Sequence, residues 1–102
     1  MSNKLKFTRG DTLRLHIDVF KEDGTVYKLE DGDELTFTLK RDPMQAAPLV
    51  QKTGSDVTIA PEDTEDLPFG VYCYDVQLTF SGGDVWTVIK PTSFEILPEV
   101  TW

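Results

Sequence analysis

Apolar and polar residues alternate one by one over three long stretches of the chain, residues 12–20, 34–41 and 72–80. A period of two is expected of a β-strand that places one face on a hydrophobic core and the other in water. Each stretch is therefore predicted to be a strand. The apolar residues expected to point inward are Leu13, Leu15, Ile17, Val19, Leu35, Phe37, Leu39, Tyr72, Tyr74, Val76, Leu78 and Phe80.

Turn signals divide the rest of the chain into short elements. Asp-Gly pairs at 23–24 and 31–32 and the Gly-Gly pair at 82–83 suit tight turns, because glycine tolerates positive φ. The other predicted elements are strands over residues 49–53, 56–60 and 85–97, one helical turn or plain coil over 61–67, and an irregular loop with two prolines over 42–48.

About seven to nine short strands with no amphipathic helix favour an all-β sandwich. The length of 102 residues suits one domain, residues 1–102, with a single core. Pro91 interrupts the last strand, which is therefore expected to be an edge strand or to contain a bulge.

Residues 67–72 resemble the tyrosine corner of immunoglobulin-like and fibronectin-like domains. The matching positions are Leu67, Pro68, Gly70 and Tyr72. In such a corner the tyrosine hydroxyl bonds to backbone a few residues upstream, and here the acceptor is expected within residues 61–67. The resemblance implies an immunoglobulin-like β-sandwich. The alternative is that Tyr72 is only a core aromatic residue.

Charge and cysteine content narrow the classes of partner. The net charge of −8 and the pI near 4.4 disfavour binding to nucleic acid or to an anionic membrane surface. Cys73 is the single cysteine, so no internal disulfide can form. The N-terminal residues lack the apolar run of a secretory signal, so the cytoplasm is the expected place of synthesis and residence, and assembly of a particle inside a cell would fit equally well.

Few side chains suit catalysis. His16 is the only histidine and lies on the polar face of its predicted strand, so a multi-histidine zinc site is excluded. The sequence also shows no plausible acid-base or nucleophile pair. Cys73 has no cationic neighbour in sequence that would activate its thiol. The acidic turn around Asp31 and Asp33 lacks the spacing of a calcium loop. The chain is therefore predicted to be non-enzymatic, with no cofactor and no metal.

The order of motifs along the chain resembles that of small proteins and N-terminal domains from tailed bacteriophages and prophages, with upper baseplate proteins as the nearest named family. The pieces are RGDT, EDGDELTFTLKRD, the corner, YDV, the Gly-Gly hairpin and FEILPEVT. The resemblance implies a structural module of the virion, in a tail, baseplate or head accessory role, that docks to other phage structural proteins. The Arg9-Gly10-Asp11 tripeptide lies between a short apolar segment, residues 5–7, and the first long strand, and no secretion signal precedes it. It is therefore interpreted as the turn into that strand rather than as an adhesion motif.

A bacterial carbohydrate- or surface-binding sandwich is the alternative function. Such a module favours a platform of exposed aromatic residues, which only Trp86, Phe20 and Tyr27 could supply.

The hairpin at residues 81–84 provides a candidate interface. An even-numbered turn would put Val85, Thr87 and Ile89 on the core face and leave Trp86 and Val88 outward, beside Val71 and Cys73. An odd-numbered turn would reverse the assignment and bury Trp86. Trp102 either inserts into a neighbouring subunit, which would make a homo-oligomer, or folds back on its own sheet. The candidate interface residues are Val71, Cys73, Trp86, Val88 and Trp102.

Overall fold

The structure is a computed structural model that describes residues 4–42, 44 and 47–98. Within these residues the chain is mostly strand, which confirms the predicted all-β fold. The elements are β1 (Leu5–Thr8), β2 (Leu13–His16), β3 (Val19–Phe20), β4 (Val26–Tyr27), β5 (Glu34–Lys40), β6 (Val50–Thr53), β7 (Asp56–Ile59), α1 (Pro61–Thr64), β8 (Gly70–Thr79) and β9 (Val85–Leu97).

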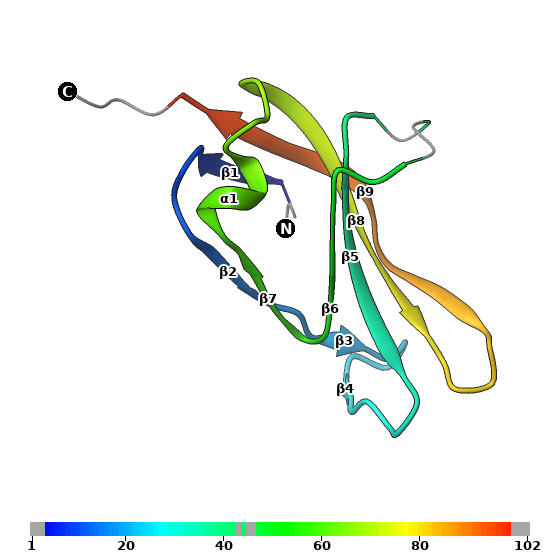
Figure 1. The fold of residues 1–102 in the computed structure, drawn as a ribbon. Helices are drawn as coiled ribbons and strands as arrows, with labels where there is room; N and C mark the ends of the chain where they lie inside the picture. Colours follow the sequence, from blue (N-terminus) through cyan, green and yellow to red (C-terminus); the bar gives the residue numbers. More distant parts are fainter. Residues whose placement is uncertain (1–3, 43, 45–46, 99–102) are drawn as a thin grey trace.

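The strands form one large sheet and two small ones. The large sheet has the order β1-β9-β8-β5-β6, and the small sheets pair β2 with β7 and β3 with β4. β1 runs parallel to β9, whereas the other neighbours are antiparallel. Figure 1 shows β2 and β7 as a layer facing the large sheet, with α1 at one end of that layer.

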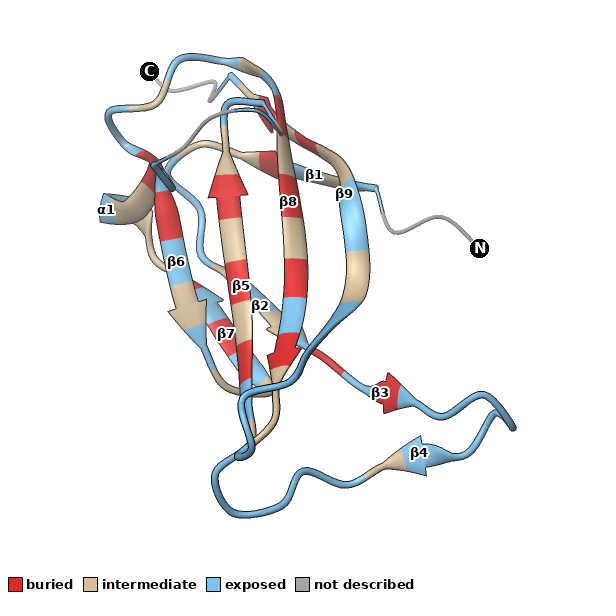
Figure 2. Ribbon diagram, turned by 90° about the vertical axis from the view of Figure 1, so that its right-hand side faces the viewer, coloured by how far each residue is buried: buried red, intermediate tan, exposed pale blue. Residues whose placement is uncertain are grey.

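The core lies between the large sheet and the β2–β7 layer. Buried and less buried residues alternate along β5 and β8 (Figure 2), as the period of two predicted. The centre of the core is aromatic: Phe94 contacts Phe7, Phe37 and Tyr74 at ring-centroid distances of 6.0, 6.4 and 6.0 Å. Three of the residues expected inward, Leu13, Leu15 and Phe80, are only partly buried and pack against this core.

The strand predicted over residues 12–20 is divided in two. β2 pairs with β7, and the chain then leaves that sheet so that Val19 and Phe20 of β3 pair with Tyr27 and Val26 of β4. The division was not predicted because alternation shows which face is buried but not which neighbour supplies the pairing. Elsewhere the ends differ slightly: the helical turn is shorter than residues 61–67, β8 begins at Gly70, and part of the 42–48 loop lies outside the described residues.

The Tyr72 hydroxyl bonds to backbone upstream of β8, as expected, but its acceptor differs from the predicted one. The Tyr72 hydroxyl donates to the Pro68 carbonyl oxygen at 2.6 Å. The acceptor range predicted from the sequence, residues 61–67, is therefore wrong by one residue. The chain turns into β8 at Gly70, whose φ of 145° favours glycine. Leu67 packs against the core.

Replacing Tyr72 with phenylalanine is expected to lower the free energy of unfolding by about 1 kcal/mol, because it removes one hydrogen bond and keeps the buried ring. Urea denaturation would measure this, with an unchanged m-value as the sign that only stability changed. A variant as stable as the parent would show that the hydroxyl contact adds nothing to the corner.

The Arg9-Gly10-Asp11 tripeptide forms the tight turn after β1. The Asp11 amide donates to the Thr8 carbonyl at 3.1 Å, and Gly10 has a φ of 90°. The Arg9 amide donates to the Leu97 carbonyl at 3.0 Å, and its guanidinium lies 4.3 Å from the centre of the Phe69 ring. The arginine is thus packed on the protein rather than presented at the tip of a loop.

Candidate docking site

The β8–β9 hairpin has an odd-numbered turn. The Phe80 amide donates to the Asp84 carbonyl and the Gly83 amide to the Phe80 carbonyl, both at 2.8 Å, so residues 81–83 form the turn. Trp86 is consequently paired with Leu78, a fully buried residue of the inner face. The outward orientation predicted for Trp86 from an even-numbered turn is therefore wrong, because a shift of one residue exchanges the two faces of a strand.

Trp86 is nevertheless exposed, which the odd-numbered turn was not expected to allow. Its exposed fraction is 51%. In Figure 1 the β2–β7 layer lies away from the β8–β9 turn and faces the other end of the large sheet. Trp86 therefore lies on the inner face at a place where little covers that face.

A chain of aromatic contacts supports the Trp86 ring. It packs edge-on against Phe80 at 4.9 Å between ring centroids, and Phe80 packs edge-on against Tyr27 at 5.9 Å. The Tyr27 hydroxyl donates to Asp33 Oδ2 at 2.7 Å, and this bond raises the pKa of Tyr27 to about 12. The Glu30 amide and the Tyr27 hydroxyl lower the pKa of Asp33. The tryptophan is thus held in place by the protein itself.

A groove runs between β3 and the first half of β9. Its volume is about 600 Å³, and among the described residues that line it Asp18 is the one that carries a charge. Phe20, with an exposed fraction of 60%, stands on the β3 side, and Trp86 stands on the β9 side. An exposed apolar surface of this kind on an acidic protein is typical of a binding site.

A second cavity of about 480 Å³ continues from the groove towards the core. The two share Asp18, Phe20 and Ile89. The second cavity reaches the core residue Phe37 and ends near Leu5, at the start of β1. The side of the molecule between β9 and the β2–β3 segment is therefore open along much of its length.

The structure brings together only part of the interface predicted from the sequence. Trp86 and Val88 both line the groove. Val71 and Cys73 lie on the opposite, outer face of the large sheet, beside Pro91. Trp102 lies outside the described residues. Burial, with the charges of Asp42 and Asp75, raises the pKa of the Cys73 thiol, which disfavours the reactive thiolate.

Some groove residues were not found by sequence reasoning. Asp18 and Val19 line the groove, whereas the alternation over residues 12–20 predicts only a strand there. The signal in the sequence for this side of the groove is Phe20, an aromatic residue directly before a charged turn, which the sequence analysis relates only to a carbohydrate platform.

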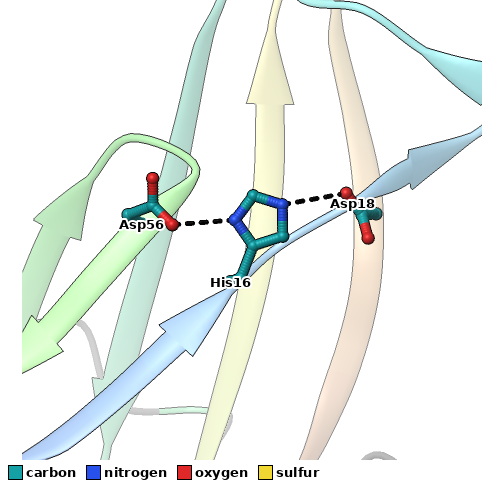
Figure 3. Close-up of polar contacts among 3 residues, drawn as sticks. All are labelled: His16, Asp18 and Asp56. Atoms are coloured by element: carbon teal, nitrogen blue, oxygen red, sulfur yellow. Dashed lines mark hydrogen bonds and ion pairs between the residues drawn. The ribbon is translucent and has the colours of Figure 1, made fainter.

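Asp18 belongs to a polar cluster beside the groove. His16 lies between two aspartates (Figure 3): its Nδ1 is 2.7 Å from Asp56 Oδ1 and its Nε2 is 3.1 Å from Asp18 Oδ1. His16 and Asp56 are direct cross-strand partners in the β2–β7 sheet. The bond to Asp56 and the charges of both aspartates raise the pKa of His16 above its ordinary value of 6.5.

The contacts of His16 with Asp18 and Asp56 are expected to make the free energy of unfolding depend on pH near neutrality. Because the folded-state pKa is raised, the contribution is complete below the unfolded pKa of about 6.5 and is lost as pH rises through the higher folded value. The melting temperature should therefore fall as the pH rises above about 6.5. A His16→Gln variant should lose this dependence.

Salt provides the control for the His16 prediction. All three side chains are exposed, so added salt should weaken the effect in the parent protein. A pH dependence that persists unchanged in His16→Gln would assign it to other groups.

Within the described residues, no helix has the length and apolar character needed to cross a membrane. The same residues contain no group of three or more histidine, cysteine or acidic side chains arranged to hold a metal ion. Comparison with protein-family models, curated proteins and solved structures finds no match to the chain.

Proposed function

We propose that the protein is a non-enzymatic interaction module of a phage or prophage particle, in a tail, baseplate or head accessory role, and that it docks to other virion proteins. The observation that carries the docking role is the exposed Trp86, which is held by Phe80 and Tyr27 and lines a groove opposite Phe20. Preorganised tryptophans are frequent centres of binding energy in protein interfaces. The motif order along the chain supports the phage assignment.

The finer fold assignment, an immunoglobulin-like sandwich with a tyrosine corner, is part of the same proposal. Three features support it: two facing layers, the parallel pairing of β1 with β9, and the Tyr72 hydroxyl bonded to backbone upstream of β8. Sandwiches of this kind serve many functions, so the site and not the fold supports the docking role.

Particle association is the direct test. After prophage induction of the encoding bacterium, particles would be purified on a density gradient and their proteins identified by mass spectrometry. The chain is expected in the particle fraction together with tail or head proteins. Recovery only in the unsedimented fraction would contradict a virion role.

Binding to carbohydrate is the second candidate, favoured by the exposed rings of Trp86 and Phe20 on either side of the groove. A glycan array would test it. Binding of a sugar that Trp86→Ala removes, by a chain that is absent from particles, would replace the first proposal with this one.

A further inference from the structure

One edge of β9 lacks a neighbouring strand over most of its length. β1 pairs with β9 only from Phe94 to Leu97. Among the described strands, none pairs with residues 85–93 on that side. An unpaired edge presents a row of backbone donors and acceptors that can accept another strand.

The register identifies which peptide groups point outward. In an antiparallel ladder, directly opposite residues alternate between hydrogen-bonded and non-hydrogen-bonded pairs. The Phe80–Asp84 pair is hydrogen-bonded, so the Trp86 peptide groups point towards β8. Those of Val85 and Thr87 point to the open edge. The regular alternation ends there, because the register shifts by one residue between the Gln77–Thr87 and Val76–Ile89 pairs.

The groove lies directly beside this edge. Residues 85–89 line it from β9, and Val19 and Phe20 line it from β3. Side chains of a strand that adds to the edge point alternately to the two faces of the sheet, so every second side chain would enter the groove next to Trp86. The second cavity continues this path to Leu5, where β1 already pairs with the same edge.

We infer that residues 85–90 of β9 bind an extended segment of another protein by β-strand addition, with apolar side chains of that segment in the groove beside Trp86 and a basic residue next to Asp18. This inference rests on the docking role proposed above and names how docking occurs. Pro91 has no amide, so the added strand is expected to end there.

The charge of the molecule favours a different protein over a second copy. Each chain carries a net charge of −8, and the groove contributes Asp18. Two copies paired through this edge would bring like charges together, whereas a segment with lysine or arginine would be attracted. A helical segment would leave the outward peptide groups of Val85 and Thr87 without partners.

A library of short random peptides displayed on their encoding RNA is the probe. Selected peptides are expected to alternate apolar and polar residues and to be enriched in lysine and arginine. In a Trp102→Phe background, binding should shift the emission of Trp86 to shorter wavelength. Hydrogen exchange should slow at the amides of Val85 and Thr87. Failure to select any binder, or protection confined to other strands, would overturn the inference.

Changes to the backbone of the peptide and to that of β9 distinguish strand addition from binding by side chains in the groove alone. N-methylation of the peptide at amides that face β9 should weaken binding about tenfold or more, and methylation at the alternate amides should not. Thr87→Pro should weaken it similarly, whereas Thr87→Val, which keeps the amide, should not. Equal effects of both methylation patterns would refute strand addition without depending on a protein variant.

Two further outcomes distinguish the possible errors. Concentration-dependent dimerisation in sedimentation velocity, with the same amides protected, would make a second copy the occupant and overturn the inference. If Thr87→Pro chains enter particles as efficiently as Thr87→Val chains, the docking mode is wrong while the virion role stands. If the chain binds the peptide by strand addition but is absent from particles, the docking mode stands and the virion role is wrong.

Discussion

Replacing Phe94 with alanine is expected to lower the free energy of unfolding by about 3–5 kcal/mol, a large share of the ~5–15 kcal/mol typical of a small domain. The side chain is fully buried and contacts rings from three other strands, Phe7 of β1, Phe37 of β5 and Tyr74 of β8. Its removal would leave a cavity at the place where these strands meet. Urea denaturation followed by far-ultraviolet circular dichroism would measure the loss.

Phe20→Ala is the matched control for Phe94→Ala. It deletes the same ring from an exposed position on β3, and the expected cost is below about 0.5 kcal/mol. If the two variants lost similar stability, Phe94 could not be at the centre of the core. Phe20→Ala should instead weaken peptide binding in the groove.

Replacing Gly32 with alanine is the second large change, with an expected loss of about 2–3 kcal/mol. Gly32 has a φ of 91°, which an alanine rarely adopts, and an added Cβ would lie 2.6 Å from the Cβ of Ser81. The turn before β5 therefore packs directly on the β8–β9 turn. The substitution should also alter the fluorescence of Trp86, because it displaces the hairpin that carries this residue.

Two variants separate the causes of the Gly32 effect. Gly24 has a similar φ of 89° but open space where a Cβ would be placed, so Gly24→Ala measures the backbone strain alone, about 1 kcal/mol. Adding Ser81→Gly to Gly32→Ala removes the Ser81 Cβ, the atom that the new side chain would overlap. The double variant should therefore recover the stability that Gly32→Ala loses beyond Gly24→Ala. No recovery in the double variant would mean that the two turns are not in contact.

The sequence predicted well those elements whose pattern has one dominant cause. β5 and β8 each have one face on the core, so alternation located them to within two residues, and the inward residues of β8 were correct. The Asp-Gly turn at residues 23–24 predicts that the chain returns toward Val26, as the β3–β4 pair shows. The split of residues 12–20 could not be predicted, because the alternation continues unbroken through Ile17 and Asp18, where β2 ends and β3 begins.

The candidate site was predicted only in part, because it depends on the length of one turn. Gly82 and Gly83 both permit positive φ, and only Gly83 adopts it, at 99°. Either turn length is therefore compatible with the sequence. The choice decides whether Trp86 faces inward with Phe80 or outward with Val71 and Cys73. Its exposure on the inner face depends on how far the second layer extends, which no local pattern encodes.

The parallel pairing of β1 with β9 has a mechanical consequence. Leu5 lies opposite Phe94 and Thr8 opposite Leu97, so a pull on the chain before β1 and after β9 draws the two strands past each other in opposite directions. The hydrogen bonds between them would then be loaded together in shear and not opened one after another. When the chain is stretched this short patch would resist extension first, and force spectroscopy with the chain held at both ends would reveal it as a single rupture event.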